Sequence, residues 1–418
     1  MGVVQMDCRN WDEDIYRDAI LHDRESLSRT VFRTAFAPNP NPNPNSDHIV
    51  TASSDGSIAS YSISSCLKMG CGSARGSNWV VAEPHCLIQG HDGPAYDVKF
   101  YGSGDDSLLL SCGDDGRIRG WKWREILESE GPMQGYKLKP VLDLVNPQHK
   151  GPWGALSPIP ENNAIAVDSQ ILLIFVMSGD QTNQILAAFG RGEPNESSEI
   201  LGILILVYPV TSVLEVTSGS IYSATGDSCA YCWDMEKCEV KMVFKGHTNY
   251  LHCIVSCNSS NQIITGSEDG TARIWDCKSG KCIQVIDPEK DKKSKVSFPC
   301  ISCIALDSSE SWLACGKGQS ISLWNLPARE CVSKATTHSS VQDVLFDKNQ
   351  ILAVGAEPSL SRLNMNGDVL SLIQCAPQSV FSISLHPSGV TAVSGYGGLV
   401  DIISQFGSHS CTFRCKGF

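Results

Sequence analysis

The sequence predicts an all-β fold, a β-propeller built from seven four-stranded blades, and three observations support this prediction. First, a Gly-His turn, an apolar strand, a Ser-x-Asp-Gly turn and a β-branched strand ending in Trp-Asp follow one another within Gly246–Asp276. Second, a similar set occupies Gly90–Trp121. Third, the residue that ends this strand recurs at the length of a propeller blade, about 40–45 residues. Its five later copies are Trp233, Trp275, Trp324, Leu363 and Ile403.

The pattern within Gly246–Asp276 is the signature of a WD40 repeat, and it predicts a buried hydrogen-bond relay. The aspartate of the tight turn can accept from the histidine ring, the histidine can donate to a Ser or Thr hydroxyl, and that hydroxyl can reach the indole N–H of the tryptophan. In blade four we expect the relay residues to be His247, Thr265, Asp269 and Trp275. In blade two we expect His91, Ser111, Asp115 and Trp121.

The remaining blades keep only parts of this pattern. Blade one has Tyr in place of Trp, blade three has no well-placed histidine, and blade five has Gly318 at the aspartate position. Blades six and seven keep mainly the apolar pattern of the strands, and they have Leu363 and Ile403 at the tryptophan position. The partial sets of blades one and three are Thr51, Asp55 and Tyr61, and Ser223, Asp227 and Trp233.

Three stretches do not fit the ring. Residues 1–27 are of mixed charge and have apolar side chains at helical spacing, so we expect an N-terminal helical extension before a propeller at 28–418. The Pro-Asn run Pro38–Asn45 can only be an irregular turn. Residues 171–217 interrupt the first hairpin of blade three with two apolar runs around a polar centre. They are either a splice or gene-model product and poorly ordered, or a functional interaction loop.

Composition excludes several classes of function. The formal net charge is −12, with 33 basic against 45 acidic side chains, so direct binding of a phosphate backbone is disfavoured. The apolar runs are too short or too interrupted to span a bilayer. The acidic N-terminal residues do not resemble a secretion signal, so we expect the 19 cysteines to be reduced and mostly buried.

No catalytic or cofactor site stands out. Cys229 and Cys232 have the spacing of a metal knuckle, but they lie on a predicted strand without a second ligand pair, so we interpret them as buried thiols. The glycine-rich run Gly70–Gly76 lacks the Lys-Ser/Thr of a phosphate loop and is interpreted as a linker. The His and Asp residues of the relays are interpreted as structural, and we expect no enzyme, metal or cofactor.

Runs that the WD40 pattern does not require carry a more specific resemblance. Trp324–Val332, Ala356–Pro358, Val380–Gly389 and Gly395–His409 resemble plant members of the THO complex subunit 6 family, and the likeness extends over nearly all of the chain except 171–217. This resemblance implies a nuclear scaffold subunit of the THO/TREX assembly, supporting mRNP assembly and mRNA export. It also implies that the partners are other THO subunits and that RNA is contacted only indirectly.

The same family resemblance raises a second function, a substrate receptor of a cullin-4 ubiquitin ligase that contacts the ligase adaptor through a WDxR box. Trp275 and Asp276 match this box, but its final arginine is Lys278. Lysine keeps the positive charge and loses the bidentate fork of arginine, which counts against the ligase contact. A scaffold subunit and a ligase receptor both remain open at this point.

Overall fold

The computed structural model describes residues 28–38, 48–70, 80–129, 138–151, 153–179, 182–190, 210–288 and 300–416, together with Glu13, Arg17 and Ile20. Between residues 169 and 218 only the backbone of the strands is described. Most of the expected N-terminal extension, residues 39–47 of the Pro-Asn turn and most of the glycine-rich linker lie outside the described residues. The three described residues of the extension are helical, and Arg17 forms an ion pair with Glu13 at 3.1 Å.

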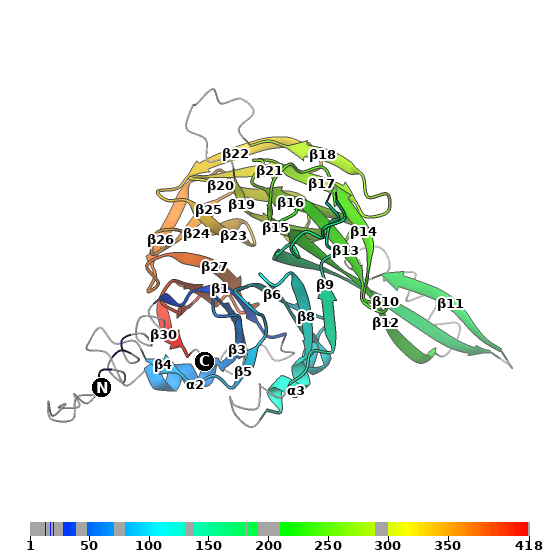
Figure 1. The fold of residues 1–418 in the computed structure, drawn as a ribbon, viewed down its shortest axis with the longest axis horizontal. Coiled ribbons are helices and arrows are strands. Elements are labelled where there is room, and N and C mark those ends of the chain that lie inside the picture. The colour runs from blue at the N-terminus through cyan, green and yellow to red at the C-terminus, as the bar shows by residue number, and fades with distance from the viewer. Residues whose placement is uncertain are drawn as a thin grey trace.

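Seven β-sheets surround a central axis, which confirms the predicted seven-bladed propeller (Figure 1). Blade one contains β1 (Val31–Phe36), β2 (His48–Ser53), β3 (Ser57–Ser62) and β5 (Cys86–Gln89). Blade two contains β6 (Ala95–Tyr101), β7 (Leu108–Gly113), β8 (Arg117–Lys122) and β9 (Leu142–Val145). Blade three contains β10 (Asn162–Gly179), β12 (Val210–Thr225), β13 (Cys229–Asp234) and β14 (Glu239–Lys245), with β11 (Thr182–Gly190) beside β10.

The other four blades follow the same antiparallel order. Blade four contains β15 (Leu251–Cys257), β16 (Gln262–Ser267), β17 (Ala272–Asp276) and β18 (Cys282–Ile286). Blade five contains β19 (Ile301–Leu306), β20 (Trp312–Lys317), β21 (Ser320–Asn325) and β22 (Glu330–Thr336). Blade six contains β23 (Val341–Asp347), β24 (Gln350–Gly355), β25 (Ser359–Asn364) and β26 (Val369–Gln374). Blade seven contains β27 (Val380–Leu385), β28 (Thr391–Gly395), β29 (Leu399–Ile403) and β30 (His409–Cys415).

Short helices occur only in connections within the described residues. α2 (Ile63–Gly70) follows β3, the 3-10 helix η3 (Gly104–Asp106) lies between β6 and β7, and α3 (Trp123–Leu127) follows β8. None of the described helices is long and apolar enough to cross a membrane.

The turns between second and third strands show why Asp-Gly recurs in this sequence. Gly56, Gly116 and Gly270 follow the turn aspartates and have φ values of +78°, +67° and +81°, which side chains with a Cβ rarely adopt. At Gly56 an added Cβ would also lie 2.4 Å from the carbonyl oxygen of His91. Glycine is therefore required both for the backbone angle and for the close approach of the next loop.

The hydrophobic core is divided into seven clusters in the described residues, and each cluster joins two neighbouring blades. One cluster combines Ile263 and Trp275 of blade four with Tyr222 and Phe244 of blade three. The cluster that combines blade one with blade seven closes the circle. Because every blade buries one face against each neighbour, no blade can complete its core alone.

The ring closes through a short parallel pairing. β4 (Val81–Ala82), in the connection before β5, pairs with β30 and adds a fifth strand to blade seven. Figure 1 shows β4 and α2 beside β30, close to the C-terminus. Arg29, two residues before β1, donates to the carbonyl oxygen of Cys415 at 3.3 Å. Segments from both ends of the propeller are thus held against each other.

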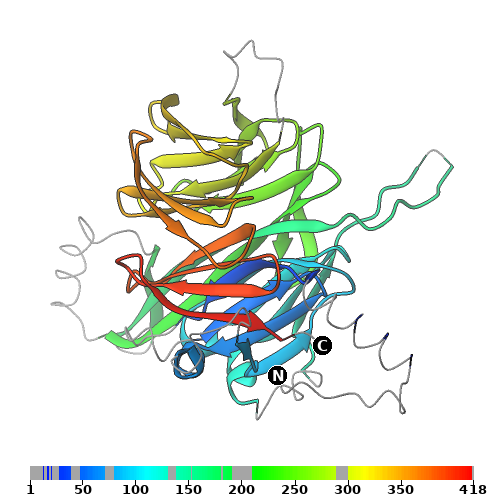
Figure 2. The same ribbon diagram turned by 90° about the vertical axis from the view of Figure 1, so that its left-hand side faces the viewer.

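The described strands within 171–217 extend the first hairpin of blade three away from the ring (Figures 1 and 2). β10 and β12 continue to pair beyond the blade, from Ile171 opposite Thr217 to Met177 opposite Val210, and β11 pairs on the far side of β10. The blade itself resumes where Gln170 lies opposite Ser218. The division into extension, propeller and inserted segment stays a prediction.

Candidate protein-interaction surfaces

Blade four holds a complete polar relay inside its core. His247 Nδ1 lies 2.8 Å from Asp269 Oδ2, and His247 Nε2 lies 2.9 Å from Thr265 Oγ1. The indole N–H of Trp275 donates to the same Thr265 Oγ1 at 2.8 Å. The structure thus brings together all four residues expected in this blade.

The direction of donation in blade four depends on the protonation of His247. Burial lowers the pKa of His247 below its ordinary value of 6.5, although Asp269 opposes this shift. A neutral imidazole carries one N–H, and Asp269 needs it, because hydrogen bonds from Thr271 and His247 outweigh burial and keep the pKa of this carboxyl low. In that form His247 Nε2 accepts from the Thr265 hydroxyl, whereas a protonated ring would donate to it, so the donation from histidine to hydroxyl stays a prediction.

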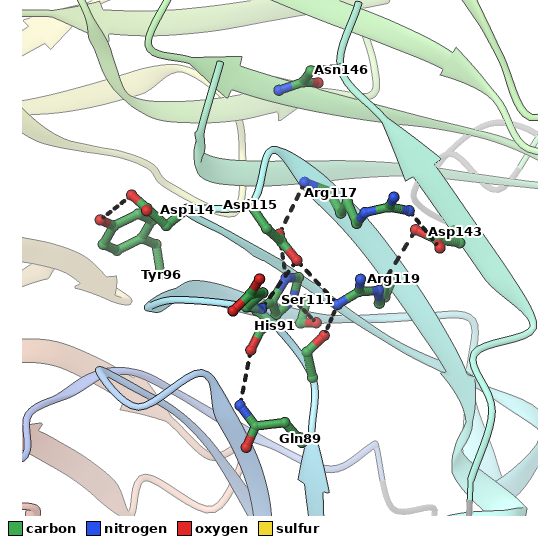
Figure 3. A network of polar contacts seen from close by, with 12 residues as sticks. Gln89, His91, Tyr96, Ser111, Asp114, Asp115, Arg117, Arg119, Asp143 and Asn146 are labelled. Carbon is green, nitrogen blue, oxygen red and sulfur yellow. Dashed lines mark hydrogen bonds and ion pairs between the residues drawn. The ribbon is translucent and has the colours of Figure 1, made fainter. Parts of the chain in front are cut away.

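Blade two forms only part of its relay (Figure 3). His91 Nδ1 lies 2.8 Å from Asp115 Oδ1 and His91 Nε2 lies 2.7 Å from Ser111 Oγ. The indole N–H of Trp121, however, is buried without a hydrogen-bond partner, so the last predicted link of this relay is wrong.

The missing link accompanies a change in strand pairing. In blade four the third and fourth strands pair through Trp275, with a bulge at that residue. In blade two the pairing of β8 with β9 stops at Gly120 opposite Leu142, one residue before Trp121, although β8 stays paired with β7 through Lys122. Trp121 therefore lacks the bulged pairing that orients the indole of Trp275.

Two relay partners were missed in the sequence. In blade one, Arg29 takes the place of the histidine: its Nε lies 3.3 Å from Asp55, and its Nη2 donates to Ser53 and Ser57. In blade three, His149 Nε2 lies 2.6 Å from Asp227, although the prediction found no well-placed histidine there. Neither residue follows a glycine as in the Gly-His turn, so the motif could not reveal them.

A charged cluster in the wall of the central channel was also missed. Arg33 of β1 contacts Asp97 of β6 at 3.2 Å and Asp343 of β23 at 2.6 Å. Both aspartates also accept backbone N–H groups of the next blade, from Ile165 at 3.0 Å and Ile383 at 2.9 Å. An alignment of the seven inner strands could have found this cluster, because all three residues occupy the third position. Arg33 thus ties together blades one, two and six.

The paired cysteines of blade three have the properties of buried thiols. Burial raises the pKa of Cys229 to about 11, and burial also raises the pKa of Cys232. A metal ligand must be a thiolate, which these surroundings disfavour at neutral pH. No cluster of three or more His, Cys, Asp and Glu side chains able to hold a metal occurs in the part of the chain that the structure describes.

The residues of the WDxR-like box have different surroundings. Trp275 is 1% exposed and belongs to the core between blades three and four. Asp276 accepts hydrogen bonds from the backbone N–H groups of Lys278 and Ser279 and from the Ser279 hydroxyl, so it shapes the turn. Lys278 is exposed. The adaptor contact of Trp275, Asp276 and Lys278 stays a prediction.

The two faces of the ring differ in charge. We call the face that carries the connections between blades and the turns between second and third strands the relay face, because the relay aspartates lie there. Two basic side chains, Arg29 and Lys150, occupy the described parts of these loops. Ten carboxylates lie in the same loops: Asp55, Asp92, Asp114, Asp115, Glu161, Asp227, Glu268, Asp269, Asp287 and Glu357.

The opposite face is nearly balanced. Apart from residues 171–217, its described loops carry nine carboxylates and eight Lys or Arg side chains. The carboxylates are Glu83, Asp105, Asp106, Glu125, Glu128, Glu236, Asp307, Glu310 and Asp368. The basic residues are Lys68, Arg124, Lys139, Lys237, Lys278, Lys281, Arg329 and Lys348. Among loop residues the acidic excess therefore lies on the relay face. Two strand residues also reach this face and offset part of it: Arg119 contacts Asp115 at 3.1 Å, and Lys317 donates to the carbonyl oxygen of Gly270 at 3.2 Å.

Comparison with known proteins agrees with this architecture. The family model described as WD domain, G-beta repeat matches residues 83–122 and 238–276. Each match covers the last strand of one blade and the first three strands of the next, blade two or blade four. The chain is 53% identical to THO complex subunit 6 of Arabidopsis thaliana over 412 residues, covering 98% of both chains. It is 25% identical to THO complex subunit 6 of Homo sapiens, covering 92% of both, and 25% identical to a homolog from Danio rerio, covering 91% of this chain and 96% of that one. The chain therefore belongs to the THO complex subunit 6 family of WD40 propellers.

Proposed function

We propose that this chain is a non-enzymatic scaffold subunit of the THO complex that supports mRNP assembly and mRNA export in the nucleus. The observation that carries this proposal is the 53% identity over 98% of both chains to a protein named as a THO complex subunit. The closed ring supports it, because a propeller offers a large rigid surface to several partners at once. The acidic relay face supports a role in which RNA is bound by partner subunits.

The histidines and aspartates of the relays support a structural role over a catalytic one. His91 is 1% exposed and His247 is 7% exposed. Both nitrogens of each imidazole lie within hydrogen-bond distance of another side chain of the same relay. A general acid or base needs access to a substrate proton. The relay residues stabilise the turns of a blade, and neither imidazole nitrogen of His91 or His247 is left to accept or donate a substrate proton.

Affinity purification of the tagged full-length chain, followed by mass spectrometry, tests the proposal. We expect THO subunits to be recovered, and to remain after ribonuclease treatment because the contacts are between proteins. Tagged Lys278→Ala serves as the matched variant, since this exposed side chain makes no core contact and its loss should leave THO recovery unchanged. Recovery of a cullin-4 ligase adaptor without THO subunits, and its loss in Lys278→Ala, would contradict the proposal and support the ligase receptor.

We further propose that residues 171–217 are not needed for the ring or for its assembly. The backbone register supports a clean deletion, because Gln170 and Ser218 are directly opposed and a two-residue Asn-Gly turn can join them. We expect the shortened chain to unfold at the same temperature as the full chain and to recover the same THO subunits. Unchanged unfolding with loss of one THO subunit would instead identify the segment as an interaction loop.

A further inference from the structure

The second residue of each inner strand forms a ring around the mouth of the central channel on the relay face. Each inner strand starts at that face, and in all seven blades its first and fourth residues are buried and its second is half-buried; the third is also buried except at Arg33 of blade one. The seven second-position residues are Phe32, Tyr96, Asn163, His252, Ser302, Gln342 and Phe381.

Three of these seven side chains are aromatic and lie on consecutive blades, seven, one and two. The ring centroids of Phe32 and Phe381 lie 5.8 Å apart in an edge-to-face arrangement, and those of Phe32 and Tyr96 lie 5.5 Å apart. The three rings thus form a continuous half-exposed strip along the channel mouth. We call Phe381, Phe32 and Tyr96 the aromatic arc.

Other second-position residues form hydrogen bonds within the propeller. Asn163 donates to the carbonyl oxygen of Leu251 at 2.8 Å, and Ser302 donates to the carbonyl oxygen of Val341 at 2.6 Å. These bonds tie each residue to the next blade. Phe32 and Phe381 have no polar side-chain atoms, and all three aromatic rings are only half-buried, so part of their surface faces solvent.

Carboxylates border the arc at its blade-two end. The Tyr96 hydroxyl donates to Asp114 Oδ1 at 3.1 Å, and Figure 3 shows this pair to one side of the blade-two relay. Asp114 is exposed, and Glu161 is half-buried. Burial raises the pKa of Tyr96 to about 12, and the neighbouring Asp114 carboxylate adds to this shift. Glu161 lies on the same face, in the connection between β9 and β10.

We propose that the aromatic arc, with Asp114 and Glu161, binds an arginine side chain from an extended segment of a partner protein. A guanidinium group stacks on aromatic faces, attracted by their negative quadrupole, and its planar fork pairs with carboxylates. The aromatic arc supplies the ring faces, and the carboxylates Asp114 and Glu161 supply the negative charge. The proposal deepens the scaffold function by naming the surface and the chemistry of one partner.

The charge of the relay face favours this occupant over the alternatives. A phosphate backbone would meet ten carboxylates and two basic side chains in the described loops. The linker 289–299 of this chain, outside the described residues, also belongs to a connection between blades, and its sequence contains four lysines and two acidic residues. It is therefore the competing occupant, and the experiment must distinguish it from a partner.

The test measures binding of labelled peptides to the purified full chain by fluorescence anisotropy. The probes are three ten-residue Gly-Ser peptides that carry three arginines, three lysines or three glutamines. We expect the arginine peptide to bind at least tenfold more tightly than the glutamine peptide and several-fold more tightly than the lysine peptide. Equal affinities for the arginine and lysine peptides would overturn the proposal, because charge alone does not need the aromatic arc.

Two variants locate the site without removing core volume. Asp114→Asn with Glu161→Gln keeps the shape of both side chains and removes their charge, and Phe381→Leu keeps an apolar side chain while removing one ring. We expect each variant to weaken binding of the arginine peptide at least fivefold, with unchanged circular dichroism. Glu236→Gln, which removes an exposed carboxylate from the opposite face, is the matched control and should bind as the unmodified chain does.

Two outcomes would reject the proposal. Unchanged affinity in the Asp114→Asn/Glu161→Gln variant would place the peptide elsewhere. A several-fold gain in affinity when the four lysines of 289–299 are replaced by glutamine would show that the chain's own linker occupies the arc. Because these are binding measurements on the isolated chain, their failure leaves the recovery of THO subunits, and hence the proposed function, untouched.

Discussion

Blade two and blade four carry the same four relay residue types but use their polar side chains differently. In blade four the relay is complete. Asp276, the residue after Trp275, accepts a hydrogen bond from the backbone N–H of Ser279 and stabilises the following turn. In blade two the indole of Trp121 is left without a partner. Both blades carry a polar pair at the rim, Tyr96 with Asp114 in blade two and His252 with Glu268 in blade four. The two blades thus differ in the last link of the relay and in the residue at the rim, which is an aromatic phenol in blade two and an imidazole in blade four.

The largest effect that separates the two blades is expected from truncation of their tryptophans. Trp275→Ala removes a 1% exposed side chain that packs against Phe244 and His247, and it also leaves Thr265 without its indole donor. We expect a loss of about 3–5 kcal/mol in unfolding free energy, measured by urea titration. Trp121→Ala should cost about 1 kcal/mol less, because no hydrogen bond is lost. A larger loss for Trp121→Ala would contradict the comparison.

Removal of the relay histidines should have the next largest effect. His247→Ala removes one hydrogen-bond partner from each of Thr265 and Asp269, which keep Trp275 and Thr271, and it leaves a cavity; we expect a loss of about 2–3 kcal/mol. His91→Ala should cost about 1 kcal/mol less, since Asp115 keeps its ion pair with Arg119 at 3.1 Å. The same titration measures both variants. Equal losses would show that Arg119 gives Asp115 no support.

Replacement of each indole by a phenyl ring isolates the last link of the relay. Trp275→Phe removes a made hydrogen bond, so we expect it to cost about 1–1.5 kcal/mol more than Trp121→Phe, which removes a buried donor that had no partner. The two variants lose similar volume, and each serves as the control of the other. Thermal unfolding at equal pH checks the order, and identical shifts would mean that the indole N–H of Trp275 contributes nothing.

The smallest effect concerns pH. The folded state lowers the pKa of His247 below 6.5, so between these two values the unfolded chain binds a proton that the folded chain does not. Stability should therefore fall as the pH drops below 6.5, by a fraction of the roughly 1.4 kcal/mol that one full proton changes per pH unit. Unfolding temperatures at pH 7.5 and 5.5 measure this slope. His247→Gln should reduce the slope, and an undiminished slope would assign the effect to other groups.

The number of blades and the relay of blade four could be predicted because both depend on local chemistry. A tight turn needs Asp-Gly, an inner strand needs apolar residues, and the interval between copies is set by four strands and their turns. These requirements leave a mark at fixed spacing, even where Leu363 or Ile403 replaces the tryptophan. The fold was therefore readable in blades whose relays are lost.

Other features could not be predicted because they join residues far apart in the chain. The ring closes through β4 and β30, and Arg29 reaches Cys415 across 386 positions. The contact of Arg33 with Asp343 likewise depends on the curvature of the whole ring. The direction of donation in blade four depends on the protonation of His247, and a motif does not record that burial lowers its pKa.

The aromatic arc lies between these two cases. Its three rings occupy the same position in three inner strands, so a comparison of the strands would have selected them. Their contact, and the pairing of Tyr96 with Asp114, required the three-dimensional arrangement of blades seven, one and two.

Hydrogen exchange of the full chain, compared alone and within its purified native complex, tests most directly whether the relay face at blade two carries a partner. We expect slower exchange in the complex for peptides covering residues 92–96, 113–117 and 380–382, and unchanged exchange for residues 276–281 of blade four. Slower exchange confined to residues 276–281, with blade two unchanged, would contradict the account and assign the contact to the opposite face.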